Sequence, residues 1–245
     1  MHTPGTHPHS SYVPETSFGV WFLRTRVWQH HVLRVAIDDL DKLAGRLNGG
    51  APLRGGTMLD IGCGQGKSLG LLARKFKPDK LIGLDSHGES LVEAQQEIAR
   101  QGLSVRLIEG DCSRIPLPDA SIDVLFCHQT FHHLVDQHTA LDEFYRVLKP
   151  GGVLLFAEST KAYIDTWVIR LLFRHPMEVQ KSAEQYQDML RAKGFAFDAA
   201  HVSYPYLWWS RSRDFGLLER LKLHTPPPPG QREETLVNLA ARKPH

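Results

Sequence analysis

The segment T-M-L-D-I-G-C-G-Q-G-K, residues 57–67, constrains the fold of this chain more than any other feature. A short apolar run ends at the carboxylate of Asp60, and three glycines follow at alternate positions, Gly62, Gly64 and Gly66. Glycine permits a positive φ and leaves room for a ligand to approach the backbone. The pattern therefore predicts a buried parallel strand, a tight loop and a helix N-terminus that together hold a nucleoside-bearing cofactor.

Three cofactor classes compete for this loop. A dinucleotide loop, G-x-G-x-x-G, needs its third glycine where the chain has Lys67. A phosphate-binding loop, G-x-x-x-x-G-K-[ST], matches at Gly66-Lys67-Ser68 but needs its first glycine at Ile61. The remaining class is a loop preceded by an acid. Because a carboxylate suits an ammonium group better than an anionic pyrophosphate, this class favours S-adenosylmethionine.

Two more acids follow two more predicted strands. Asp85 ends a strand at residues 80–85, close to where α/β nucleotide folds place the carboxylate that binds ribose hydroxyls. Asp111 follows a strand at 105–109, and its carboxylate can accept a hydrogen bond from the exocyclic amine of adenine. Because the carboxyl ends of parallel strands share one edge of a sheet, we expect the three acids along one crevice.

Five segments carry a family pattern: L-D-I-G-C-G-Q-G (59–66), G-L-D (83–85), E-G-D-C-S-R-I-P-L-P-D-A-S-I-D-V-L-F (109–126), H-H-L (132–134) and R-V-L-K-P-G-G (146–152). In these segments the chain resembles the class I S-adenosylmethionine-dependent methyltransferases, and within them the small-molecule group similar to the quinone-biosynthesis C-methyltransferases. The resemblance covers roughly residues 50 to 160. It implies an α/β, Rossmann-like, doubly wound seven-stranded sheet with an antiparallel last strand. It also implies S-adenosylmethionine as cofactor and S-adenosylhomocysteine as product.

The resemblance assigns roles to the loops at the strand ends. It implies that Gly62, Cys63 and Gly64 contact the methionine part of the cofactor, and that Ser86 lies beside the adenine. It places His128 near the methionine carboxylate and the sulfonium. The full set of expected cofactor-binding residues is Asp60, Gly62, Cys63, Gly64, Gly66, Asp85, Ser86, Asp111, Cys112 and His128.

Two adjacent histidines are candidates for proton transfer. His132 and His133 follow the fourth predicted strand, at the edge where ligands bind in this architecture. A histidine at such a position can act as a general base near neutral pH. In the resembling family an H-H-[LV] run commonly packs under the cofactor without taking part in chemistry. Both interpretations stay open at this point.

A helical pattern over residues 18–47 carries aromatic side chains. Trp21 and Trp28 are seven positions apart, so we expect them on one helix face. The substrate-binding residues expected for an apolar or aromatic acceptor are Trp21, Trp28, His31, Tyr163 and Trp167. The alternative is that these residues pack a helical lid onto the core. A second aromatic cluster at 204–209 suggests a lipid-like or acidic substrate or a membrane contact.

Composition divides the chain into three parts. Residues 1–16 are rich in His, Pro, Ser and Thr and are expected to form a disordered tail. Residues 17–50 form the helical lid, and 51–245 form the cofactor-binding domain with an insertion near 207–231. The other expected strands lie at 122–127, 152–158, 199–206 and 236–241, and the other expected helices at 67–76, 139–148, 165–174 and 183–193.

Charge and cysteine content exclude several partners. The net charge is +2, from 29 basic and 27 acidic residues, and this balance argues against a nucleic-acid partner. The three cysteines show no disulfide pattern and no secretory signal is visible, so a cytoplasmic location is expected. No apolar run reaches the ~18 residues of a membrane span. No Cys/His or acidic group has convincing metal-ligand spacing along the sequence, so no metal is expected. The chain is expected to be a monomer or a homodimer.

These patterns predict a methyltransferase for a small apolar or aromatic metabolite, with an oxygen, nitrogen or carbon acceptor, in quinone or specialised-metabolite biosynthesis. The segment Cys127-His128-Gln129-Thr130 lacks the [DNS]-P-P-[YFW] motif of nucleic-acid amino-methyltransferases. A protein methyltransferase or a regulatory protein that binds the cofactor without turnover is the alternative. The acceptor atom lies beyond what the sequence determines, because one cofactor scaffold serves several acceptors.

Overall fold

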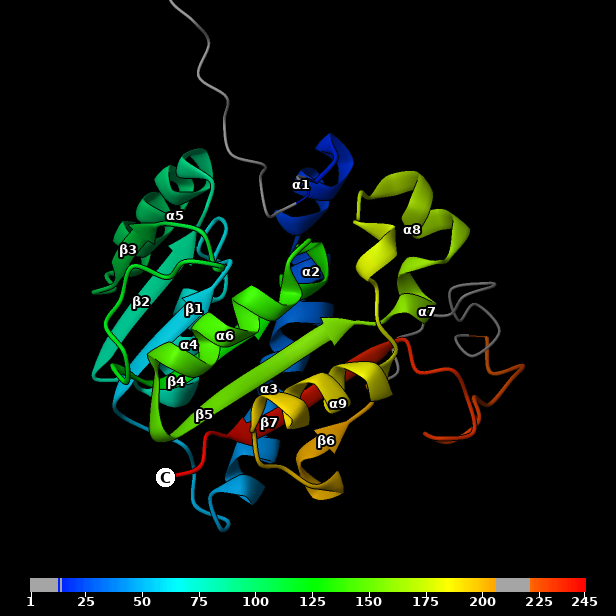
Figure 1. Cartoon of the computed structure of the whole chain (residues 1–245). Helices are drawn as coiled ribbons and strands as arrows, with labels where there is room; N and C mark the ends of the chain where they lie inside the picture. Colours follow the sequence, from blue (N-terminus) through cyan, green and yellow to red (C-terminus); the bar gives the residue numbers. More distant parts are fainter. Residues whose placement is uncertain (1–12, 14, 206–220) are drawn as a thin grey trace, which may run out of the picture.

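Short apolar runs that alternate with amphipathic segments build a three-layer α/β structure. In the computed structural model, helices cover both faces of a sheet with strand order β3-β2-β1-β4-β5-β7-β6 (Figure 1). The structure describes residues 13, 15–205 and 221–245. The strands are β1 (Thr57–Ile61), β2 (Lys80–Asp85), β3 (Arg106–Glu109), β4 (Ile122–His128), β5 (Leu148–Ser159), β6 (Val202–Ser203) and β7 (Leu236–Arg242). The pairs from β3 to β5 are parallel and β7 is antiparallel to both neighbours, which confirms the predicted fold.

Strand β1 runs through the middle of the sheet and is buried on both faces. Met58 and Leu59 point to opposite faces, and both are fully buried. Parallel strands covered by helices on both sides read as nearly continuous apolar runs for this reason. Asp60 breaks the run where the strand approaches its carboxyl end, next to the glycine loop.

The covering helices face the sheet with their apolar sides. One face is covered by α3 (Arg34–Leu47), α4 (Leu69–Phe76) and α5 (Gly88–Gln101), and the other by α6 (Gln137–Val147) and α9 (Ala183–Lys193). Leu40 and Phe76 belong to the first core cluster, and Phe144 and Tyr186 belong to the second. Two separate cores therefore hold the sheet rigid beneath the loops at its carboxyl edge.

The single helix predicted over residues 18–47 is interrupted. The segment contains α1 (Ser17–Leu23), α2 (Arg26–Trp28), a π-helical turn (Gln29–Leu33) and α3. Thr25 has an extended backbone with ψ 151°, and its hydroxyl accepts a hydrogen bond from the Trp28 N–H at 3.2 Å, which caps a new helix. Trp21 and Trp28 thus lie on different helices, and the expectation that they share a face is wrong.

Three residues of the segment expected to be a disordered tail, Val13, Glu15 and Thr16, make defined contacts. The Val13 N–H donates to the His133 carbonyl at 3.2 Å. The Glu15 side chain is buried, and the Thr16 hydroxyl accepts from the Gly19 N–H at 3.0 Å as the N-cap of α1. Contacts with a distant loop and a helix cap therefore hold this segment. Residues 1–12 and 14 lie outside the described part of the chain.

Two elements after β5 differ from the sequence prediction. The helix expected at 165–174 is replaced by α7 (Lys161–Ile164) and α8 (Trp167–Leu172), because Thr166 is extended and caps α8. The strand expected at 199–206 is reduced to β6, because Asp198 caps a 3₁₀ turn at Ala199–His201.

The insertion expected near 207–231 falls mainly on residues 206–220, which lie outside the described residues, as do Trp208 and Trp209 of the second aromatic cluster. None of the helices in the described ranges is both long enough and apolar enough to cross a membrane.

Candidate active site

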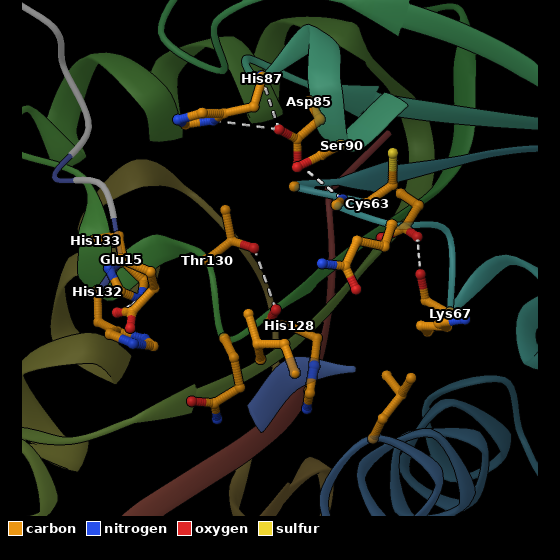
Figure 2. A pocket seen from close by; sticks show the side chains of 18 of the residues that line it. Glu15, Cys63, Lys67, Asp85, His87, Ser90, His128, Thr130, His132 and His133 are labelled. Carbon is orange, nitrogen blue, oxygen red and sulfur yellow. Dashed lines mark hydrogen bonds and ion pairs between the residues drawn. The ribbon is translucent and has the colours of Figure 1, made fainter. Parts of the chain in front are cut away.

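A cavity of about 410 Å³ lies at the carboxyl edge of the sheet (Figure 2). The loops after β1 to β4 form one part of its wall, and the segments from Glu15 to the π-helical turn and from α7 to His175 form most of the rest. Open α/β sheets bind ligands outside the carboxyl ends of their strands, so the cavity lies where the topology predicts a site.

The glycine loop is tied to the end of β2. The Gly62 N–H donates to the Leu84 carbonyl at 2.8 Å, and the Gly64 N–H donates to a carboxylate oxygen of Asp85 at 2.8 Å. Gly62 has φ +68°, and a Cβ there would lie 2.9 Å from the Cβ of Thr130. Close approach between the loops after β1 and β4 therefore requires glycine at this position.

Gly66 has a different role from the one expected for it. It is absent from the cavity wall, and a Cβ at this position would lie 3.0 Å from Ala94 on α5. Its function is close packing of the loop against a helix, which leaves Gly62 and Gly64 as the glycines of this loop that face the cavity.

Asp60 lines the cavity from the end of β1 and is only 1% exposed. One of its carboxylate oxygens accepts a hydrogen bond from the Ser68 hydroxyl. Burial raises the pKa of Asp60 to about 7; the Ser68 bond opposes this rise and the nearby Asp85 carboxylate adds to it. A cation that entered this part of the cavity would favour the ionised carboxylate.

Asp85, Ser86, Asp111 and Cys112 continue the same wall. Asp85 accepts from the His87 N–H at 2.9 Å as well as from Gly64, so its carboxylate has a defined orientation. Its hydrogen bond with the His87 imidazole raises the pKa of that histidine. The three acids predicted to end successive strands are thus brought to one cavity.

His128, at the end of β4, is a neutral histidine within the cavity. Its ring stacks on Phe126 with centroids 5.9 Å apart and lies 5.7 Å from the ring of Trp28. Burial lowers its pKa to about 4. Its Nε2 atom is buried and has no hydrogen-bond partner among the described residues, so it is available to a ligand.

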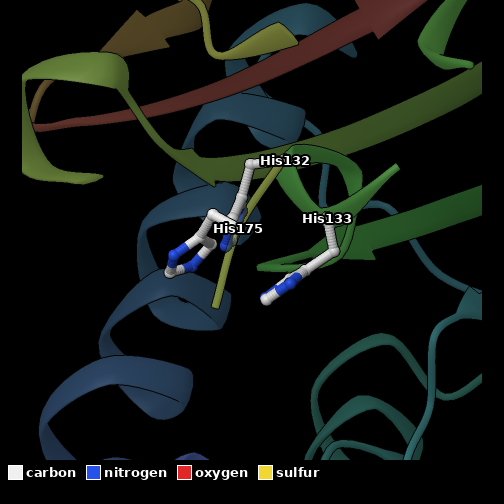
Figure 3. A group of neighbouring side chains, drawn as sticks. All are labelled: His132, His133 and His175. Atoms are coloured by element: carbon white, nitrogen blue, oxygen red, sulfur yellow. The ribbon is translucent and has the colours of Figure 1, made fainter. Parts of the chain in front are cut away.

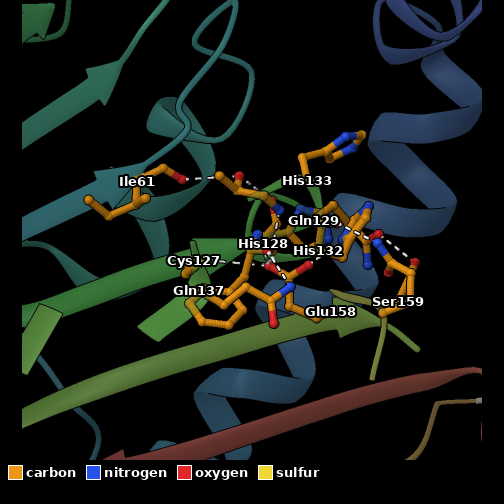
Figure 4. Close-up of polar contacts among 12 residues, drawn as sticks. Ile61, Cys127, His128, Gln129, His132, His133, Gln137, Glu158 and Ser159 are labelled. Carbon is orange, nitrogen blue, oxygen red and sulfur yellow. Dashed lines mark hydrogen bonds and ion pairs between the residues drawn. The ribbon is translucent and has the colours of Figure 1, made fainter. Parts of the chain in front are cut away.

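Glu158, at the carboxyl end of β5, belongs to the polar network of the candidate site, and it was not among the site residues expected from the sequence. It is fully buried, and its Oε1 accepts from the N–H groups of Thr130 at 3.0 Å and Phe131 at 2.9 Å (Figure 4). Its Oε2 lies 2.5 Å from Nδ1 of His132. Burial alone would raise the pKa of Glu158, but His132 and the two N–H groups lower it. An acid at the end of the apolar run V-L-L-F-A-E (153–158) was the available signal.

Three histidines meet at the other end of the cavity (Figure 3). The ring centroids of His132 and His133 are 4.4 Å apart, and His175 lies 5.1 Å and 4.7 Å from them. His133 Nε2 is also 3.5 Å from Oε1 of Glu15. Burial lowers the pKa of His133, lowers that of His175 to about 3 and raises that of Glu15 to about 7. Sequence reasoning named His132 and His133 but neither His175 nor Glu15.

Only some of the expected substrate-binding residues line the cavity. Trp28 and Tyr163 line the cavity. Trp21 and Trp167 do not, with 57% and 64% of their surface exposed, and the exposed His31 is absent from the cavity wall as well. The segments outside the strand-end loops add these apolar or aromatic residues to the wall: Val20, Phe22, Leu23, Trp28, Val32, Leu33, Tyr163, Ile169 and Phe173.

Comparison with known proteins agrees with this architecture. A family model of a methyltransferase domain matches residues 59–156. A demethylmenaquinone methyltransferase of Deinococcus radiodurans is 34% identical over 120 residues, which cover 48% of this chain and 50% of that protein. A trans-aconitate 2-methyltransferase of an Azoarcus species is 32% identical over 177 residues, 68% of this chain and 62% of that protein.

Residues 59–156 match a methyltransferase domain, and the chain is similar to class I S-adenosylmethionine-dependent methyltransferases. The fold is similar to that of a SAM-dependent methyltransferase from Aquifex aeolicus, with a TM-score of 0.59 and 21% identity over 92% of this chain and 97% of that one. The domain match supports S-adenosylmethionine as the cofactor.

The chain aligns with only part of the length of its relatives, and part of the cavity wall lies outside the matched segment. The alignments cover 36%, 50%, 39% and 62% of the length of four curated relatives. The methyltransferase-domain match contains the loops after β1 to β4, but not α1, α2, Tyr163 or His175. The cofactor side of the cavity is thus the part shared with the family, and most of the acceptor side lies outside the match.

Proposed function

We propose that this chain transfers the methyl group of S-adenosylmethionine to a small apolar or aromatic metabolite in quinone or specialised-metabolite biosynthesis. One observation carries the proposal: a single cavity joins the acid and glycine loops after β1 to β3 with an apolar wall from α1, α2 and α8. The likeness to a demethylmenaquinone methyltransferase supports a ring-bearing acceptor.

The residues on the cofactor side fit this donor. Asp60 has a serine hydroxyl as its hydrogen-bond partner and another carboxylate as its charged neighbour, so it suits an ammonium group. Asp85 would bind the ribose hydroxyls, Asp111 and Cys112 the adenine edge, and His128 the methionine end. When bound, the cofactor supplies an electrophilic methyl group.

The residues at the far end of the cavity suit removal of a proton from the acceptor. In Figure 2, His132, His133 and Glu15 lie opposite Cys63 and Lys67. Glu158 Oε2 lies against Nδ1 of His132, which leaves Nε2 of that ring to take the proton of an O–H or N–H acceptor, whereas burial lowers the pKa of His133 and makes it a weaker base. An acceptor held at this end would give its proton to His132 as it takes the methyl group that the bound cofactor would supply.

Calorimetry and a transfer assay test the proposal together. S-adenosylhomocysteine should bind to the purified chain, whereas ATP and NADH should give no heat. Transfer of a labelled methyl group is then measured with hydroquinones, phenols and aliphatic carboxylic acids. Tight binding of ATP or NADH without binding of S-adenosylhomocysteine would overturn the assignment, and binding without transfer to any acceptor would favour a regulatory protein.

Cofactor affinity should decrease in mildly acidic solution because Asp60 has a pKa of about 7 in the cofactor-free protein. The sign follows from linkage: binding favours the ionised carboxylate, so protonation below pH 7 opposes it. From pH 8 to pH 6 we expect a loss of S-adenosylhomocysteine affinity of up to about ten-fold. Because His87 and Glu15 also titrate, Asp60→Asn is the control; a pH profile as steep in that variant as in the wild type would contradict the prediction.

Truncation of Trp28 should affect the acceptor more than truncation of Trp21. Trp28 lines the cavity and contacts His128, whereas Trp21 lies outside the cavity wall. Trp28→Ala should raise the KM for the acceptor about ten-fold or more, and Trp21→Ala should leave it within about two-fold, since an exposed side chain loses little contact on truncation. Steady-state kinetics on both variants, with their melting temperatures as a control, decide the matter. If the two substitutions changed the acceptor KM equally, both tryptophans would be assigned to packing of the helical lid and not to the acceptor site.

A further inference from the structure

The histidines at the far end of the cavity have the properties of a metal site. His132, His133 and His175 each offer one ring nitrogen, and these three atoms lie within 4.8 Å of one another. Two of the residues lie in the loop after β4 and the third in the segment after α8, so the fold brings together ligands from two distant segments (Figure 3). We propose that these three histidines bind a divalent transition-metal ion, and Zn²⁺ is the ion expected.

The ligand chemistry supports zinc. Neutral imidazole suits zinc and its neighbours in the first transition row, and a site with three protein ligands keeps a coordination position open for another molecule. Two nitrogens bound to a tetrahedral zinc lie about 3.4 Å apart, given Zn–N bonds of about 2.0–2.1 Å. The three rings therefore need to close by at most about an ångström and a half from their present positions.

The surroundings of His132 match those of metal-binding histidines. Such histidines commonly place their second nitrogen against a carboxylate, which fixes the ring and raises its basicity. Here Glu158 Oε2 lies 2.5 Å from Nδ1 of His132, so Nε2 is the nitrogen left for a metal (Figure 4). The same carboxylate also binds two backbone N–H groups, which hold it in place.

A buried polar atom in the group points to a missing partner. Nδ1 of His175 is buried and has no hydrogen-bond partner in the described part of the chain. Buried polar groups are normally satisfied, and a cation is a partner that would suit this nitrogen. Glu15 Oε1 lies 3.5 Å from His133 Nε2, so a negative group adjoins the place proposed for the ion.

The metal would act on the acceptor, a step that rests on the proposed function. Because the histidines line the same cavity as the cofactor loops, the open coordination position could hold an oxygen-bearing acceptor. A hydroxyl bound to zinc loses its proton more readily. With the histidines bound to the metal, the proton would pass to Glu15 and not to His132; the new O–CH₃ bond would form, and the bond from the methyl carbon to sulfur would break. The substrate class is then a hydroxyl-bearing metabolite.

The test measures metal binding without catalysis. The full chain is stripped with a chelator and titrated with ZnCl₂ by calorimetry, with MgCl₂ for comparison, and Co²⁺ is added separately to record its visible spectrum. We expect stoichiometric zinc binding that His175→Asn weakens by about 100-fold or more and Glu158→Gln by about 10- to 100-fold. The cobalt absorption of a four-coordinate site should disappear in His175→Asn.

Two control variants separate this site from other histidines. His138→Asn removes an exposed histidine on α6, and a variant with His2, His7 and His9 changed to asparagine removes those near the N-terminus. Both should bind zinc as the wild type does. Wild-type binding that equals binding by His175→Asn, or binding lost in the N-terminal variant, would overturn the proposal.

Folding and cofactor binding are monitored on the same samples. If His175→Asn lowers the melting temperature strongly, His133→Gln is the second variant, and it should also lose zinc. S-adenosylhomocysteine binding distinguishes the two proposals: if it persists while zinc binding is absent, the metal site is wrong and the proposed function stands. If zinc binds but S-adenosylhomocysteine does not, the proposed function fails and the metal site stands.

Discussion

Glu158→Ala is expected to lower the free energy of unfolding by about 3–5 kcal/mol, the typical effect of removing one partner from a buried charged group. The substitution leaves the N–H groups of Thr130 and Phe131 and Nδ1 of His132 without their acceptor. All of these groups are buried, so water does not replace the lost bonds. Urea unfolding, followed by circular dichroism at pH 8, measures the change.

Matched substitutions show whether the loss arises from this network. Glu158→Gln keeps the volume and one acceptor oxygen, so it should lose about half as much stability. Asp188→Ala removes an exposed acid on α9 and should change stability by less than about 0.5 kcal/mol. If Glu158→Ala were no more destabilising than Asp188→Ala, the carboxylate would not organise the loop after β4.

Gly62→Ala is expected to weaken S-adenosylhomocysteine binding by about 100-fold or more and to destabilise the fold by about 3 kcal/mol. Alanine at φ +68° costs about 1–2 kcal/mol, and its Cβ would overlap the side chain of Thr130. Thr130 has little room to move, because its hydroxyl donates to the carbonyls of Ile61 and His128 at 3.3 and 3.2 Å. Calorimetry and thermal melting record the two effects.

Gly102→Ala separates backbone strain from steric overlap. Gly102 has φ +63°, and no atom lies within 4 Å of the place where a Cβ would stand. This variant therefore carries the strain without the overlap, and it lies outside the cavity wall. It should lose only about 1–2 kcal/mol of stability and bind S-adenosylhomocysteine normally. Similar losses in the two variants would show that Thr130 does not restrict the glycine loop.

The sheet and the cofactor side of the cavity were predictable because their signals are local. An apolar run followed by Asp60 or Asp85 is a strand with an acid at its carboxyl end, whatever the rest of the chain does. Parallel pairing then brings these acids to one edge. Gly66 is the exception on this side. The glycine pattern placed it in the loop, but the pattern did not show that Gly66 packs on α5 instead of lining the cavity.

The acceptor side was less predictable because its residues meet only after packing. An extended Thr25 ends one helix and caps the next, which separates Trp21 from Trp28 although the apolar periodicity continues through this position. His175 and Glu15 have no motif around them, and each becomes relevant only through contact with His132 or His133. The expectation that no metal would be bound rested on spacing along the sequence, which does not show this group.

The amino-acid sequence by itself determined the parallel strands, the glycine loop and the acids at one sheet edge, since each depends on residues a few positions apart. The tertiary structure alone decided which buried polar groups meet. His132 and Glu158 are 26 positions apart and lie 2.5 Å from each other because β4 and β5 pair side by side. Such contacts depend on the packing of distant segments, whose register no local pattern contains.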